Sequence, residues 1–227
     1  LYPLLGMEKV KFRNPVVPGD RLVTEVTEEQ ADETARVFRG VAKVGNTVTS
    51  EGLFRIGVQP REDMKDVRRS MTESAPSLPA GDAAGELSVT QIMEAIPHRF
   101  PMLLVDRVLH FDADNNRIVG LKNITGNEPV FQGMRLPILP DYLQVEMAAQ
   151  TGCTLALAKP ENTGKVVFFM AIDKATFMAP VVPGDQLVID IAVKGKGKFG
   201  RAEGTVYIGG REVTTFAIKF AVVDRTG

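Results

Sequence analysis

One hexapeptide, PVVPGD, occurs twice in this chain of 227 residues. It lies within two longer stretches, residues 7–26 and 172–191, which are identical at ten of twenty positions at a constant spacing of 165 residues. Proline fixes φ, glycine permits a positive φ and aspartate accepts bonds from backbone N–H groups, so each hexapeptide predicts a turn. A repeat at this spacing predicts two copies of one structural unit.

Strand-forming sequence follows each turn. The first copy continues with TARVFRGVAKVG and TVTSEGLFRIGV, and the second with GRAEGTVYIGG and EVTTFAIKFAVV. Alternating polarity and β-branched residues favour strands in all four segments. Each copy is therefore predicted to end in an antiparallel meander of about three strands.

The two copies differ in what precedes them. Residues 86–170 precede the second copy and predict a short helix, two strands and a longer helix, the first helix beginning at the capping-box pattern Ser88-x-x-Gln91. Only six residues precede the first copy, so about eighty residues have no counterpart there. A bare meander leaves one sheet face without a covering helix. We expect another piece of chain, a second subunit or a swapped element to cover it.

Composition excludes several classes of function. The net charge is −1, which gives no electrostatic reason for nucleic acid or an anionic membrane to be the main partner. No apolar run is long enough to span a bilayer, and no signal peptide is evident. One cysteine and two histidines exclude an intrachain disulfide and disfavour a zinc site. We therefore expect a cytoplasmic protein without a metal or another cofactor.

Four motifs carry a resemblance to a known family. They are IMEAIPHRFPMLLVDRVLHFD, KNITGNEPVFQG, LQVEMAAQTG and the second PVVPGD segment. In combination these resemble the FabZ-type 3-hydroxyacyl-acyl-carrier-protein dehydratases. The resemblance covers residues 87–224 in full and residues 5–58 as a partial second copy.

The resemblance implies an α+β hot-dog fold, in which an antiparallel sheet wraps a central helix and units pair through their sheets. For this chain it implies a tandem, or double, hot dog with an incomplete first unit. The expected domains are a partial unit at residues 1–58, a linker rich in Pro, Ala, Gly and Ser at residues 59–86, and a complete unit at residues 87–227.

The resemblance also implies a site that removes water from 3-hydroxyacyl thioesters, using a glutamate on the central helix and a histidine directly after FQG. Glu146 matches the glutamate, and Gln150, one turn later, could hydrogen-bond it. The residue after FQG is Met134, whose thioether cannot exchange protons in water. The unit's own site therefore lacks its histidine.

Other residues are expected to bind substrate. They are Gly133, Met134, Pro140, Asp141, Gln150, Phe168 and Phe169. Asp141 is also predicted to cap the central helix, through the capping-box-like Asp141-x-x-Gln144. Phe168 and Phe169 are predicted primarily to pack in the core from a strand, and in the family such residues also line the acyl tunnel. His98 is predicted to order the PHRFP loop, and Cys153 to be a small packed residue.

The preferred hypothesis is a composite site. Glu146 would work with a histidine supplied from outside the sequence, and the substrate would be an acyl thioester, expected on an acyl carrier protein. Homo- or hetero-oligomers through sheet pairing are expected. One alternative is a non-catalytic subunit that stabilises an active partner and binds acyl chains. A hot-dog thioesterase is a lesser alternative, disfavoured by the PHRFP and FQG stretches.

Overall fold

The computed structural model describes residues 2–59, 85–196 and 198–225, so the predicted linker lies almost wholly outside the described residues. The first four strands are β1 (Leu4–Phe12), β2 (Leu22–Ala31), β3 (Ala35–Val44) and β4 (Thr47–Gly57). They are followed by α2 (Val89–Ala95), β5 (Arg107–Asp112), β6 (Arg117–Asn123), the 3-10 turn η1 (Pro129–Phe131), α3 (Tyr142–Leu157) and the 3-10 turn η2 (Pro160–Asn162). The last strands are β7 (Lys165–Phe177), β8 (Gln186–Lys196), β9 (Phe199–Ile208) and β10 (Arg211–Asp224).

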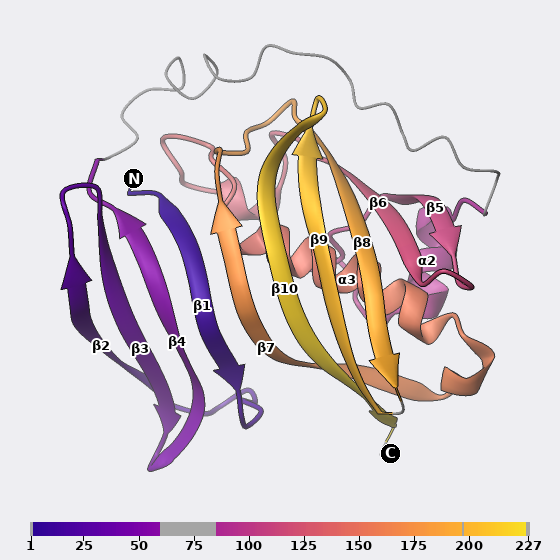
Figure 1. Cartoon of the computed structure of the whole chain (residues 1–227), viewed down its shortest axis with the longest axis horizontal. Coiled ribbons are helices and arrows are strands. Elements are labelled where there is room, and N and C mark those ends of the chain that lie inside the picture. Colours follow the sequence, from indigo (N-terminus) through magenta and orange to yellow (C-terminus); the bar gives the residue numbers. More distant parts are fainter. Residues whose placement is uncertain (1, 60–84, 197, 226–227) are drawn as a thin grey trace.

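The strands form one antiparallel sheet in the order β2-β3-β4-β1-β7-β10-β9-β8-β6-β5 (Figure 1). Helix α3 packs on β6 to β10, and its buried face includes Val145, Ala148 and Leu155. A sheet wrapped around one central helix is the predicted α+β hot-dog fold. The short helix α2 also forms as predicted, with both hydrogen bonds of the Ser88–Gln91 capping box.

The two PVVPGD turns have the same geometry. In the first, the backbone N–H of Val17 donates to Asp20 Oδ2 at 2.9 Å, and Gly19 has φ +98°. In the second, Val182 donates to Asp185 Oδ2 at 2.7 Å, and Gly184 has φ +99°. Only glycine adopts such a φ without strain. The predicted turn chemistry is confirmed in both copies.

The two copies meet at β1 and β7 in a two-fold register. Met7 pairs with Ala175, and Val10 pairs with Ile172. In the repeat, Met7 is the counterpart of Ile172, and Val10 is the counterpart of Ala175. Each copy therefore presents the same positions to the other.

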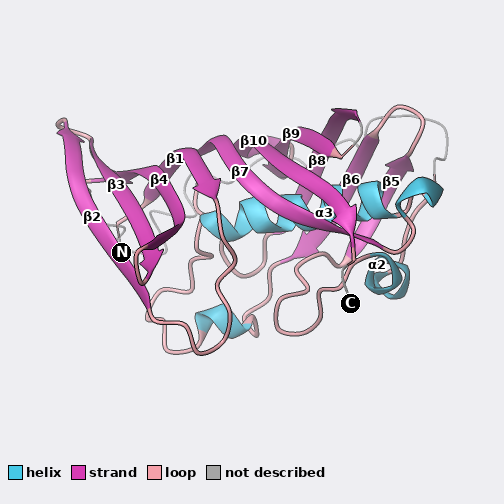
Figure 2. Cartoon of the chain, turned by 90° about the horizontal axis from the view of Figure 1, so that it is seen from below, coloured by secondary structure: helices cyan, strands magenta, loops and turns pink. Residues whose placement is uncertain are grey.

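The outer strands of the first copy lack the cover that α3 gives to β6 to β10, whereas Met7 and Val10 on β1 are buried in the core that includes α3. Figure 2 shows α3 lying along one face of the sheet below β7 and β8, while β2 and β3 extend away from it. Every residue of β2 is exposed, including Leu22 and Val26. The expectation that one sheet face needs cover from elsewhere agrees with this exposure.

The β2–β3 turn is expected to depend on pH through Asp32. Its Oδ1 accepts bonds from the Thr34 hydroxyl at 2.6 Å and from the N–H groups of Thr34 and Ala35, and these bonds lower the pKa of Asp32 from 3.8 to about 2. Because the folded pKa is the lower one, the stabilisation is present above about pH 4 and is lost as pH falls towards 2. Amide hydrogen exchange should show the turn opening over this range, and Asp32→Ala should open it at neutral pH. Unchanged exchange in that variant would contradict the role of Asp32.

Candidate active site

Helix α3 is locked against the sheet by polar contacts as well as apolar packing. Gln144 is fully buried, and its Oε1 accepts a 2.7 Å bond from the Thr214 hydroxyl on β10. Gly120 on β6 leaves room for Thr151, because a Cβ at Gly120 would stand 2.6 Å from the Thr151 hydroxyl oxygen. The turn of α3 that carries Glu146 therefore has a fixed position.

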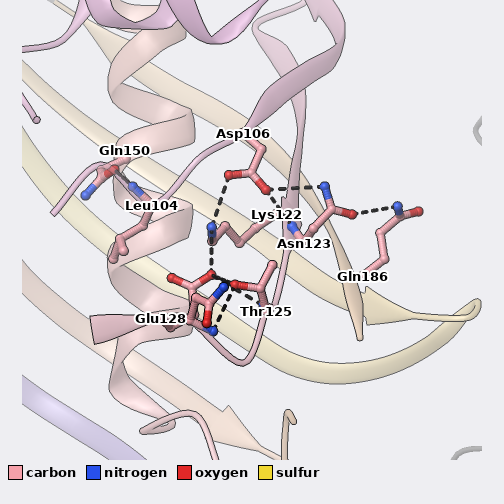
Figure 3. Close-up of polar contacts among 9 residues, drawn as sticks. Leu104, Asp106, Lys122, Asn123, Thr125, Glu128, Gln150 and Gln186 are labelled. Atoms are coloured by element: carbon pink, nitrogen blue, oxygen red, sulfur yellow. Dashed lines mark hydrogen bonds and ion pairs between the residues drawn. The ribbon is translucent and has the colours of Figure 1, made fainter. Parts of the chain in front are cut away.

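Gln150 holds Glu146 from one side, as predicted. Its Nε2 donates to Glu146 Oε1 at 2.8 Å and to the carbonyl of Met102 at 2.8 Å. Its own Oε1 accepts the N–H of Leu104 at 2.9 Å, and Figure 3 shows Gln150 beside Leu104. With both ends of the amide engaged, Gln150 fixes the carboxylate to the FPMLLV segment.

His98 contacts the same carboxylate, which the sequence did not predict. Its Nε2 lies 3.6 Å from Glu146 Oε1, and the two side chains are 31% and 32% exposed. Its Nδ1 is buried without a hydrogen-bond partner among the described residues. The predicted role of His98 in ordering the loop stays a prediction. Arg99 also orders this loop, because its guanidinium donates to the carbonyls of Met93, Ile96 and His98.

An apolar cavity of about 80 Å³ extends from this acid–imidazole pair between α3 and the sheet. His98, Glu146 and Gln150 line its polar end. The apolar wall is formed by Cys153, Val167, Phe169, Ala202, Ile218 and Phe220. Its lining, apolar with a few converging polar groups, is of the kind found in small-molecule sites, although its volume is smaller than theirs.

A second cavity, open and of about 1050 Å³, lies on the other side of Glu146. Tyr142, Val145, Glu146, Phe168 and Phe169 line it on one side, and the inner face of β1 to β4 lines it on the other. Glu146 and Phe169 thus belong to both cavities. The carboxylate stands where the smaller apolar cavity meets the larger one.

The structure gathers some predicted residues and separates others. Glu146, Gln150, Phe168 and Phe169 line the two cavities, whereas Gly133, Met134, Pro140 and Asp141 line neither. The predicted capping role of Asp141 is wrong: its backbone is already helical (φ −57°, ψ −35°) and its side chain makes no capping hydrogen bond. Gln144, the other half of that pattern, is turned to Thr214 instead.

A buried lysine joins the two loops that flank the site. Lys122 Nζ lies 3.0 Å from Asp106 Oδ1 and 3.1 Å from Glu128 Oε1 (Figure 3). Asp106 closely follows the FPMLLV segment that binds Gln150, and Glu128 directly precedes η1 and the FQG segment. The ion pairs therefore tie the Gln150-binding loop to the FQG loop.

Cys153 is expected to be inert in the folded protein. Burial, with the nearby charge of Glu146, raises the pKa of its thiol from 9.0 to about 12. Because the thiolate is the reactive form, a maleimide at neutral pH should label Cys153 only after unfolding. Mass spectrometry with and without denaturant measures this, and rapid labelling of the native protein would contradict the packed position of Cys153.

Comparison with known proteins decides the family. A family model described as a FabA-like domain matches residues 96–217. This chain belongs to the FabA-like family. The 3-hydroxyacyl-[acyl-carrier-protein] dehydratase FabZ of Pelotomaculum thermopropionicum is 45% identical over 139 residues, which are 60% of this chain and 99% of that protein.

Solved structures place the whole described fold among hot-dog proteins. The dehydratase domain of PpsC from Mycobacterium tuberculosis has a TM-score of 0.64 at 14% identity, covering 97% of this chain and 76% of that one. A hot-dog protein of unknown function from Alicyclobacillus acidocaldarius has a TM-score of 0.61 at 13% identity, covering 100% and 81%. At these identities the likeness is one of fold.

Two further findings bear on the class of site. Among the described residues, no three His, Cys, Asp or Glu side chains gather as a metal site requires. Within the same residues, no helix is long and apolar enough to cross a membrane.

Proposed function

We propose that this FabA-like chain takes part in the dehydration of 3-hydroxyacyl thioesters, carried by an acyl carrier protein, to trans-2-enoyl thioesters. The observation that supports this most directly is the position of Glu146, held by Gln150 at the polar end of an apolar cavity. A hydroxyacyl chain has the matching polarity: an apolar tail and a reacting hydroxyl near its thioester end.

The reaction needs two proton transfers. A base removes the proton beside the thioester carbonyl, and an acid gives a proton to the hydroxyl, which leaves as water while the carbon–carbon double bond forms. Glu146 is assigned the acid role and must be protonated before each turnover. The base must stand where the substrate can lie between it and Glu146.

His98 does not fit the role of base. Its Nε2 and Glu146 Oε1 are 3.6 Å apart, so no substrate atom fits between them. We assign His98 a positioning role and propose that the base is a histidine supplied from outside these 227 residues. It would approach Glu146 from the open cavity, and the chain alone is expected to turn over slowly.

An assay of the native protein, with the chains that purify with it, separates the three candidate functions. Dehydratase activity removes the conjugated enoyl absorbance of a crotonyl thioester by hydration, without releasing thiol. A thioesterase releases thiol instead. Acyl-thioester binding without either reaction would overturn the proposal in favour of a non-catalytic subunit.

A further inference from the structure

The uncovered face of β1 to β4 has the pattern of a face that binds a helix. Leu22 and Thr24 on β2 and Ala42 on β3 line the open cavity. Leu22 pairs with Val44 in the sheet, as Leu187 pairs with Ile208 in the second copy. The first copy therefore repeats, strand for strand, the inner face that α3 covers in the second.

Equivalent positions differ sharply in burial. Leu22 and Val26 are 49% and 63% exposed, whereas their counterparts Leu187 and Ile191 are fully buried. The second copy owes this burial to α3, which packs on β8 and β9. Exposed apolar side chains gathered on one face mark a binding surface.

The two-fold register of β1 and β7 indicates where a partner helix would lie. The rotation that exchanges Met7–Ala175 with Val10–Ile172 also carries β8 onto β2 and β9 onto β3. The same rotation carries α3 onto the open face of the first copy. A helix placed there would face β2 and β3 as α3 faces β8 and β9.

We propose that the open face of β1 to β4 binds the central helix of another FabA-like segment, one whose helix is not covered by a sheet of its own. Such a segment would complete a second hot-dog unit around residues 1–58. The docked helix would also border Glu146, because Glu146, Tyr142 and Val145 line the same cavity. This inference goes beyond the proposed function and does not depend on it.

Adjacent cysteine substitutions test the proposal. Leu22→Cys faces the open cavity, while Val23→Cys lies on the opposite face of the same strand with a similar exposure of 45%. The probe is a copy of residues 86–165 fused ahead of Leu1, which is the counterpart of Val166. The added copy carries Cys153→Ser.

Fusion should slow maleimide labelling of Leu22→Cys at least about tenfold and leave Val23→Cys unchanged. Equal labelling of Leu22→Cys with and without the added copy would overturn the proposal. Protection that rises with concentration in the unfused chain would also overturn it, because a second copy would then cover the face.

A separate observation concerns Phe220. A cavity of about 390 Å³ lies beyond the cavity of about 80 Å³, and Phe220 lines both. On α3, Cys153 lines the first cavity and Ala156 lines the second. On β9, Ala202 lines the first and Gly200 lines the second. The two cavities therefore lie in line along α3.

The ring of Phe220 is part of the lining of both cavities. It lies directly over Gly200, since a Cβ at Gly200 would overlap the ring. Resting on the proposed function, we infer that Phe220 ends the acyl cavity and limits the length of acyl chain that the site accepts.

Binding of saturated acyl-pantetheine thioesters of increasing length tests this inference, using Glu146→Gln protein so that no turnover intervenes. Each methylene buried should raise affinity about fourfold until the chain meets Phe220. Phe220→Leu and Phe220→Ala should extend this rise to longer chains, while Val222→Ala, which lines only the distal cavity, should not. An unchanged limit on acyl-chain length in both Phe220 variants would overturn the inferred role of Phe220. A shifted limit without dehydratase activity in the unsubstituted protein would uphold it and reject the proposed function.

Discussion

Glu146→Gln is expected to lower the rate of enoyl-thioester hydration by about 10²- to 10⁴-fold, the usual contribution of a positioned general acid or base. Glutamine preserves the size of the side chain and can still meet Gln150, so the fold should be unaffected. It cannot give up a proton to a leaving hydroxyl. The loss should therefore appear in kcat, measured with the native protein and the chains that accompany it.

Glu161→Gln is the matched control, because Glu161 lies on η2 and lines neither cavity that holds Glu146. It should leave the rate unchanged. His98→Asn distinguishes a positioning role from a catalytic one. If His98 positions Glu146, this variant should lower the rate less than Glu146→Gln does, and it should shift the pH profile of the rate. Full activity in Glu146→Gln, with thermal unfolding unchanged, would reject the assignment of Glu146.

Lys122→Met is expected to lower the free energy of unfolding by roughly 3–5 kcal/mol, the range for removing one partner of a buried ion pair. The Lys122 side chain is only 9% exposed and faces both Asp106 and Glu128. Removing its charge leaves the Glu128 carboxylate, whose side chain is only 14% exposed, without its cation, while Asp106 is 35% exposed and keeps its bonds to Asn123. Urea denaturation measures the change.

Lys174→Met is the control for Lys122→Met. The Lys174 side chain is 66% exposed and lies 3.9 Å from Glu8, so its removal should change the free energy of unfolding by about 0–1 kcal/mol. Combining Lys122→Met with Asp106→Asn and Glu128→Gln should recover part of the loss, because no uncompensated charge then remains. Equal effects of the two lysine variants would show that the Lys122 pairs do not hold the loops.

Local sequence predicted the parts of the fold that depend on near neighbours. The PVVPGD turns, the Ser88–Gln91 box and the contact of Gln150 with Glu146 each lie within one turn of chain, where geometry follows from residue type. Asp141 shows the limit of such reasoning. A cap requires an extended residue before the helix, and the chain entering α3 is already helical at Asp141.

Contacts between distant segments could not be read in the same way. His98 meets Glu146 in a loop whose FPMLLV segment is bound by Gln150, which is far along the chain. The sequence offered no local pattern linking His98 to α3. The position of the Phe220 ring over Gly200 likewise depends on the pairing of β9 with β10.

The register between β1 and β7 has a consequence for shortened forms of this protein. A chain beginning near Leu87 would retain β7 but lose β1, leaving a row of unpaired N–H and C=O groups along a sheet edge. Because Met7 and Val10 are the counterparts of Ile172 and Ala175, a second β7 could take the place of β1 with Ile172 opposite Ala175 in both directions. Truncation would thus turn an internal seam into a self-complementary surface, and the shortened protein should be a symmetric dimer.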